Sequence, residues 1–281
     1  MNPKRRELCA LLLASLFPIN AAAGQRPLKL GLFPYLSPQR LVTLYKPLAT
    51  YLENQLHQTV KLGSTKDFHS FIVATQRGDF DIVLTAPHLA WLAQANAGYR
   101  PIATYANTVS GLLVVKRSSE IHSASGLRGG VIAIPDPLAV VTLLMESYLA
   151  KQSLQSGKDY RFIARGTHDN AALSVTSGEA AAAVIASLAY EKLPDATRTR
   201  LRIIGRTAAV SSVFFMVNKH LDQSTADAVQ AALLHFNDTA AGQAFLEQTH
   251  YQRILPADSH SLSSMSVYAL QIQRMIRNKQ P

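Results

Sequence analysis

Polar side chains that could contact a small ligand follow the ends of several predicted strands. In an α/β protein the carboxyl ends of parallel strands lie at one edge of the sheet, so side chains placed there gather around a bound molecule. Hydroxyl and imidazole groups suit polar ligand atoms, whereas Phe68 at the start of a predicted helix would supply apolar contact. The candidate ligand-binding residues are Tyr35, Phe68, Thr85, His88, Ala139, Val140, Thr142, His168, Asp169 and Ser187.

The segment 131–144 is the central feature of this prediction. Residues 131–134 are predicted to form a buried strand, residues 135–137 read Pro-Asp-Pro, and a helix is expected to follow. The first N–H groups of a helix have no partner inside the helix and bind anionic groups well. Ala139, Val140 and Thr142 therefore enter the candidate set through their place at this helix start. Each candidate also has a structural explanation, such as packing for Phe68 or favourable interaction with the helix dipole for Asp169.

No sequence motif indicates catalysis. The chain has no GxSxG elbow, no GxxxxGK phosphate loop, no GxGxxG and no HExxH. We therefore predict no catalytic residue, no cofactor and no metal site. An enzyme on the same scaffold stays an alternative, with Asp169 and either His168 or His88 as its acid and base. The same three residues would form a metal site only if they converged.

Strands and helices alternate along the chain and predict an α/β fold of two lobes. This alternation predicts mainly parallel sheets that are covered by helices on both faces. We expect lobe 1 to comprise residues 25–107 and 210–281, and lobe 2 to be inserted as residues 108–209. The chain would then cross between the lobes twice, near 105–111 and 206–212, as two hinge segments. Predicted strands are 28–33, 60–62, 81–85, 100–105, 111–116, 131–134, 160–164, 181–186, 202–204 and 213–217; predicted helices include 40–56, 67–78, 138–151, 167–178, 224–237, 239–248 and 261–277.

Residues 1–23 have the pattern of a secretory signal peptide. A basic start (Lys4, Arg5, Arg6) precedes a short apolar run and a small-residue cleavage site. Cleavage would remove three basic residues and one acidic residue and lower the net charge from +10 to +8. The only cysteine, Cys9, lies in this segment. We expect a periplasmic protein without stable membrane insertion after cleavage. Scattered basic residues without interleaved aromatics argue against nucleic acid as a partner.

Six segments resemble one known family. They are Gly31–Pro38, Lys66–Phe68, Gly78–Val83, Gly129–Ala133, Asp136–Pro137 and Gly166–Leu173. In this order they resemble the PhnD-like periplasmic proteins that bind phosphate, phosphite or phosphonate for ABC transporters. The resemblance implies a hinged, two-lobe binding protein of the type II periplasmic class. It also implies that a small ligand is delivered to an ABC transporter permease, or alternatively sensed together with a sensor kinase.

The residues at the family's ligand-binding positions differ from the family's usual pattern. Phosphonate binders usually carry a Ser-Thr-Ser-Gly-like cluster after the Asp-Pro, where this chain has Ala139, Val140, Val141 and Thr142. Phe68 stands where the family often has tyrosine. Each lost donor to a buried charged group costs about 1–3 kcal/mol. We therefore predict a ligand other than a simple phosphonate, such as an apolar or aromatic acid or another small organic molecule.

Overall fold

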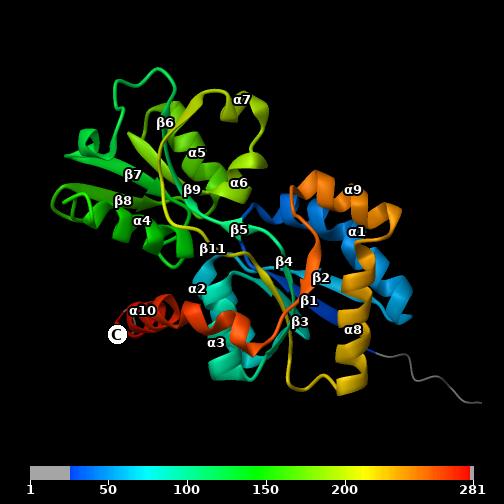
Figure 1. The fold of residues 1–281 in the computed structure, drawn as a ribbon. Helices are drawn as coiled ribbons and strands as arrows, with labels where there is room; N and C mark the ends of the chain where they lie inside the picture. The colour runs from blue at the N-terminus through cyan, green and yellow to red at the C-terminus, as the bar shows by residue number, and fades with distance from the viewer. Residues whose placement is uncertain (1–25, 279–281) are drawn as a thin grey trace, which may run out of the picture.

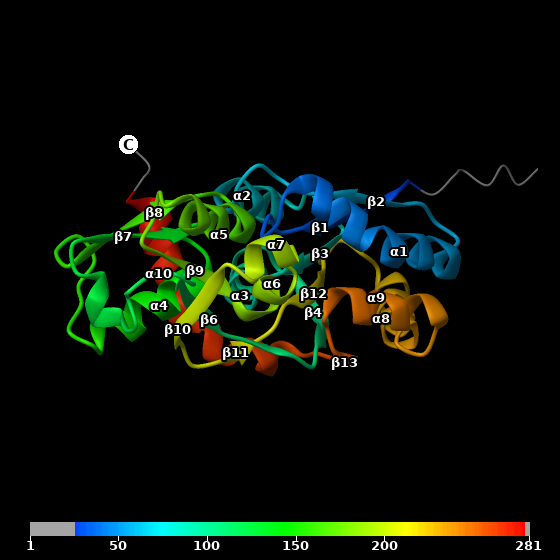
Figure 2. The ribbon, with the colours of Figure 1, turned by 90° about the horizontal axis from the view of Figure 1, so that it is seen from above.

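The computed structural model describes residues 26–278, and the predicted signal peptide at residues 1–23 lies outside the described residues. Figure 1 shows two groups of strands and helices, with the green and yellow elements above and the blue, cyan and orange elements below. Turned by 90°, Figure 2 shows the two groups side by side along the long direction of the molecule. We call the group around the six-stranded sheet lobe 1 and the group around the five-stranded sheet lobe 2. The predicted two-lobe α/β fold is confirmed.

Lobe 1 is built on a six-stranded sheet in the order β13-β4-β12-β3-β1-β2. Helices α8 and α9 pack on α1, whereas α10 and η2 pack on α3 (Figure 1). The strands are β1 (Leu28–Leu32), β2 (Val60–Gly63), β3 (Ile82–Thr85), β4 (Arg100–Tyr105), β12 (Phe214–Val217) and β13 (Ile254–Pro256); the helices are α1 (Pro38–Leu56), α2 (Phe68–Arg77), α3 (Pro87–Ala97), α8 (Gln223–Phe236), α9 (Ala240–Thr249), η2 (Ser259–Met265) and α10 (Ser266–Arg277).

Lobe 2 is built on a five-stranded sheet in the order β10-β6-β9-β7-β8. Helices α4 and α5 both pack on this sheet, and α6 follows β9 directly. The strands are β6 (Gly111–Lys116), β7 (Gly130–Ile134), β8 (Tyr160–Ala164), β9 (Ala182–Ala186) and β10 (Leu201–Arg206); the helices are η1 (Ala124–Leu127), α4 (Val140–Ala150), α5 (His168–Ser177), α6 (Ser187–Glu191) and α7 (Asp195–Arg198). The short helices α6 and α7 were not expected from the sequence.

The pairing within both sheets is mixed, which corrects the expectation of mainly parallel sheets. Strands β1, β2 and β3 are parallel to one another, as are β7, β8 and β9. Strand β12 is antiparallel to β3 and β4, and β6 is antiparallel to β9 and β10. The antiparallel pairs arise because the chain crosses between the lobes twice. A strand that enters a lobe from the hinge runs opposite to strands whose carboxyl ends point toward the hinge.

Two short strands connect the lobes. β5 (Thr108–Val109) and β11 (Val210–Ser211) pair antiparallel as a separate two-stranded ribbon. Each lies between a strand of one sheet and a strand of the other. Paired crossing segments of this kind let two lobes rotate about a common hinge. The predicted lobe boundaries at residues 107/108 and 209/210 stay a prediction.

Local sequence signals place the helices that border the space between the lobes. Asp67 caps α2 by accepting a hydrogen bond from Ser70 N at 2.7 Å, and Thr167 caps α5 in the same way from Asn170 N at 3.2 Å. Helix α4 starts at Val140, two residues later than predicted. Leu138 N donates to Asp136 Oδ1 at 2.8 Å, so Leu138 belongs to a turn rather than to the helix.

Candidate ligand-binding site

A small apolar cavity lies between the two lobes. In this closed arrangement its volume of about 50 Å³ is enough for a few water molecules. All four phenylalanine and tyrosine side chains of the lining come from lobe 1, whereas lobe 2 supplies mostly aliphatic side chains. The lining residues are Phe33, Tyr35, Phe68, Ala86, Pro87, Val109, Ala139, Val140, Val141, His168, Ala186, Leu188, Ala189, Ser212, Val213 and Tyr251.

Polar contacts join the lobes directly. Arg40 on α1 donates from Nη1 to Asp169 Oδ2 on α5 at 2.6 Å and from Nη2 to the carbonyl of Lys192 at 2.5 Å. His88 on α3 donates from Nε2 to the carbonyl of Leu138 at 2.8 Å. Buried apolar residues of both lobes also form one continuous cluster. The lobes are therefore closed on each other around the cavity.

The start of α4 offers main-chain donors rather than side-chain donors. Ala139 occupies the N-cap and makes no side-chain capping bond, and Val140 and Val141 are the first two helical residues. Their N–H groups have no partner within the helix. Thr142 Oγ1 donates to the carbonyl of Asp136 at 2.9 Å, so this hydroxyl already has an internal acceptor. The side chains at this corner thus contribute apolar surface only.

His168 is a neutral donor in the wall of the cavity. Its Nδ1 accepts a hydrogen bond from Ala186 N at 3.3 Å, which puts the ring proton on Nε2. Burial, and next the charge of Lys192, lower the pKa of His168 to about 3. The ring is therefore uncharged at neutral pH and can offer Nε2–H to an acceptor.

His88 is buried at the contact between the lobes. Burial lowers its pKa to about 4, although the hydrogen bond to Leu138 raises it. Its other ring nitrogen, Nδ1, has no hydrogen-bond partner among residues 26–278. Because a protonated ring would bury an unsatisfied N–H at Nδ1, the closed arrangement favours neutral His88.

Stacked aromatic rings form the lobe 1 side of the cavity. Phe33 stacks on Tyr35 with ring centres 4.7 Å apart, and Phe68 meets Phe33 edge-on at 6.0 Å. Tyr251 stacks on Tyr105 at 3.9 Å. The hydroxyl of Tyr35 is 3.0 Å from that of Tyr45, and burial raises the pKa of both well above 10. These hydroxyls are thus protonated and bonded to each other.

The structure brings together some of the predicted residues and places others apart. Tyr35, Phe68, Ala139, Val140 and His168 line the cavity, whereas His88 and Asp169 hold the lobes together beside it.

Three predicted residues have their side chains elsewhere. Thr85 lines a separate small cavity beneath α2 and α3, because alternate residues of β3 face opposite sides of the sheet. Ser187 Oγ accepts from Ser110 N at 3.1 Å, and Thr142 is bonded within its turn. The expectation that these three side chains gather at one ligand edge is corrected accordingly.

Four polar residues at or beside the cavity were not predicted from the sequence. Arg40 lies inside α1 and Lys192 follows the unexpected helix α6, so neither stands at the end of a predicted strand. Ser212 and Tyr251 come from the hinge and from the segment after α9. A search that included both sides of the hinge crossings could have found Ser212, but no local pattern marks the other three.

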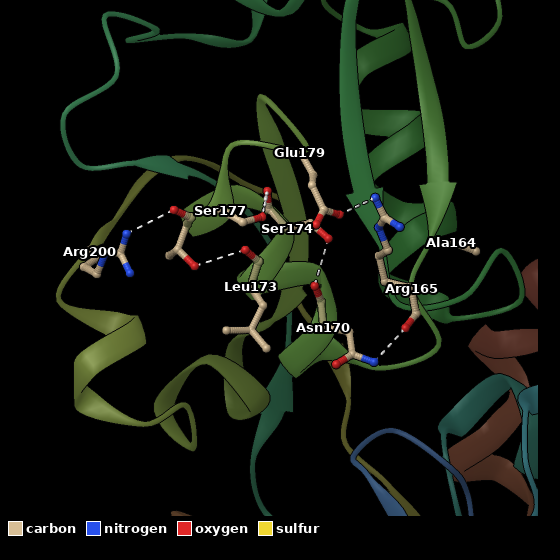
Figure 3. A pocket seen from close by; sticks show the side chains of 9 residues that line it. Ala164, Arg165, Asn170, Leu173, Ser174, Ser177, Glu179 and Arg200 are labelled. Atoms are coloured by element: carbon tan, nitrogen blue, oxygen red, sulfur yellow. Dashed lines mark hydrogen bonds and ion pairs between the residues drawn. The ribbon is translucent and has the colours of Figure 1, made fainter.

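A larger open depression of about 660 Å³ lies on lobe 2 alone. Figure 3 shows that its polar side chains point at one another: Arg165 pairs with Glu179 at 2.8 Å, and Asn170 Nδ2 donates to the carbonyl of Arg165 at 3.1 Å. Arg200 likewise donates to the carbonyl of Thr176 at 3.0 Å. Since these polar groups are already paired and no residue of lobe 1 contributes, the cavity between the lobes is the better ligand site.

No group of three or more histidine, cysteine or acidic residues is arranged to hold a metal ion within residues 26–278. His88, His168 and Asp169 thus do not form the metal site considered above. Across the same described range, no helix is long and apolar enough to cross a membrane.

Comparison with protein families decides the assignment. Residues 30–262 match the family model of the phosphonate ABC transporter periplasmic substrate-binding protein. The chain belongs to this family of periplasmic substrate-binding proteins. Members of the family are transport binding proteins rather than enzymes. The resemblance found in the sequence is therefore confirmed.

Solved structures show the same fold at low sequence identity. A binding protein component of an ABC phosphonate transporter from Pseudomonas aeruginosa has a TM-score of 0.81 at 18% identity, covering 88% of this chain and 87% of that one. PhnD1 from Prochlorococcus marinus, in complex with methylphosphonate, has a TM-score of 0.81 at 16% identity, covering 88% and 98%. A Xanthomonas citri protein bound to ATP has a TM-score of 0.70 at 19% identity, covering 88% and 98%. The similarity to these structures shows the two-lobe fold but does not identify the ligand of this chain.

Proposed function

We propose that this protein binds a small organic molecule with an apolar body between its two lobes and delivers it to an ABC transporter permease in the periplasm. The observation that carries the proposal is the cavity between the lobes, to which both lobes and the hinge contribute lining residues. A ligand held there contacts both lobes at once, so its binding energy favours the closed arrangement. A permease can then distinguish the closed, loaded protein from the open one.

The chemistry of the lining supports a ligand other than a simple phosphonate. At the start of α4 the chain presents Ala139, Val140 and Val141, none of which has a side-chain donor. The hydroxyl of Thr142 is bonded to Asp136. A doubly charged phosphonate would depend on main-chain N–H groups where side-chain hydroxyls would otherwise assist. The aromatic rings of Phe33 and Phe68 instead favour an apolar ligand body.

Calorimetry with the mature protein tests this proposal. The panel comprises phosphate, phosphite and methylphosphonate on one side, and butyrate, benzoate and phenylacetate with their primary amides on the other. We expect binding within the organic panel and none to the phosphorus compounds at up to millimolar concentration. Micromolar binding of phosphate, phosphite or methylphosphonate would contradict the ligand assignment.

A second measurement tests closure itself. Small-angle scattering with and without a ligand that binds should show a smaller radius of gyration in its presence. If a compound binds but the radius stays the same and Tyr251→Ala has no effect on affinity, the ligand does not sit between the lobes.

A further inference from the structure

Lys192 lies where lobe 2 meets the aromatic side of the cavity. It is the C-cap residue of α6, and Leu188 and Ala189 on the same helix line the cavity. Its carbonyl accepts a hydrogen bond from Arg40 Nη2 at 2.5 Å. The end of α6 is therefore held against lobe 1, and the lysine side chain starts from a fixed main-chain position.

The ammonium group of Lys192 is buried without a hydrogen bond. Its Nζ has no partner among the described residues of the chain. Nζ lies 3.8 Å from the ring centre of Tyr251 and 5.6 Å from that of Tyr35, and both rings line the cavity. The ring faces attract a cation, but they leave its three N–H donors without an acceptor.

The nearby carboxylates do not neutralise this lysine. Asp169 is paired with Arg40 at 2.6 Å, and Glu191 is paired with Arg198 at 3.6 Å. A buried charge is normally paired, because its desolvation is otherwise uncompensated. Burial lowers the pKa of Lys192, and Tyr251 beside it raises the pKa only in part, so an anion placed next to Nζ would favour the charged form further.

Other polar groups around the cavity can also donate a hydrogen bond to a ligand. Ser212 lines the cavity, is 1% exposed, and its Oγ has no partner within the described chain. The Nε2–H of His168 and the first N–H groups of α4, at Val140 and Val141, belong to the same wall. The lining residues include several neutral donors and no carboxylate, and Lys192 lies beside them against the rings of Tyr251 and Tyr35. This combination suits an oxyanion of single charge.

We infer that Lys192 is the residue that recognises the carboxylate of a small organic acid bound between the lobes, an inference that rests on the proposed binding function. Its four-carbon stem lets Nζ leave the face of Tyr251 and reach an oxygen in the cavity. The apolar body of the acid then contacts the aromatic and aliphatic lining. The ligand class is accordingly a monocarboxylic acid with a small apolar substituent.

The first test needs no ligand. In Lys192→Met a flexible apolar side chain of similar length replaces the unpaired charge against the tyrosine rings. If Lys192 serves ligand recognition and not stability, Lys192→Met purified without added ligand should have a melting temperature about 2 °C or more above that of the wild type. Lys158→Met, at an exposed position of lobe 2, is the matched control and should melt as the wild type does. A lower melting temperature for Lys192→Met would show a structural lysine and overturn the inference.

The second test compares acids with their amides. Calorimetry of butyrate, benzoate and phenylacetate against the corresponding primary amides separates recognition of the charge from recognition of the apolar body. For an acid that binds, we expect at least a tenfold preference over its amide. Lys192→Met should lose that preference by weakening the acid alone, Lys192→Arg should keep part of it, and Lys158→Met should keep all of it.

The outcomes separate this inference from the proposed function. Equal binding of acid and amide, or an unchanged preference in Lys192→Met, overturns the role of Lys192 while small-molecule binding stands. Binding of methylphosphonate alone overturns the carboxylate class. Absence of binding by every compound overturns both.

Discussion

Arg40 on α1 and Asp169 on α5 lie 129 residues apart in the sequence and form an ion pair of 2.6 Å between the lobes. The same guanidinium also donates to the carbonyl of Lys192. Asp169 belongs to the Gly-Thr-His-Asp segment that marks the family resemblance, and its neighbour His168 lines the cavity. The pair therefore connects closure of the lobes to the wall of the binding site.

Replacing Arg40 by methionine should shift the lobes toward the open arrangement. The arginine is 37% exposed and the aspartate 16%, so solvent screens the pair and its contribution is on the order of 1 kcal/mol, about a fivefold change in the ratio of closed to open molecules. Small-angle scattering should give a larger radius of gyration for Arg40→Met. Arg253→Met, which removes an ion pair with Asp238 inside lobe 1, is the control. An unchanged radius in Arg40→Met would mean that the pair does not hold the lobes together.

Acid should destabilise the protein through His88. The pKa of this histidine is about 4 in the folded state, against about 6.5 in the unfolded chain. Between these values the unfolded chain binds the proton, so the free energy of unfolding falls as the pH decreases from 6.5 to 4. The full effect is about 3 kcal/mol. Chemical denaturation at several pH values measures the slope.

The variant His88→Gln keeps a side-chain donor for the carbonyl of Leu138 but cannot titrate. It should show a shallower dependence of the free energy of unfolding on pH below 6.5. His69→Gln changes an exposed histidine and should leave the slope as it is. If His88→Gln and the wild type have the same slope, His88 is not the group that takes up the proton.

Side-chain hydroxyls at the start of α4 should create affinity for phosphonate. The triple variant Ala139→Ser, Val140→Thr, Val141→Ser restores donors where the family usually has them. Each hydrogen bond to a charged group contributes about 1–3 kcal/mol, so methylphosphonate should bind at least about tenfold more tightly than it does to the wild type. Calorimetry measures this gain, and the melting temperature shows whether the variant is folded. A folded variant without any gain would show that these positions do not contact the ligand.

Gly31 in β1 should not tolerate a side chain. A Cβ atom there would lie 2.6 Å from the ring of Phe80, a residue that is itself buried in the core. Gly31→Ala should therefore lower the free energy of unfolding by about 1–3 kcal/mol through overpacking. At Gly63 the nearest ring atom would be 3.2 Å away, so Gly63→Ala should cost less. Denaturant titration gives both values, and a smaller loss at Gly31 than at Gly63 would contradict the packing argument.

The order and type of most elements could be predicted from the sequence. Apolar periodicity and helix caps are local signals, and Asp67 and Thr167 cap helices close to the starts predicted at residues 67 and 167. The family segments likewise depend on short stretches of sequence. Strand direction is not local: β12 and β6 are antiparallel to their neighbours because the chain crosses the hinge twice.

In the binding site, too, some features follow from the local sequence and others only from the tertiary structure. The sequence by itself determined that the start of α4 carries Ala139 and Val140 in place of hydroxyl residues, and that His168 and Tyr35 follow predicted strands. Only the tertiary structure decided which faces of the strands meet, and so turned Thr85 away from the site and left Lys192 against Tyr251. The physical reason is that a charge's partners depend on residues distant in the chain, as the pairing of Asp169 with Arg40 shows.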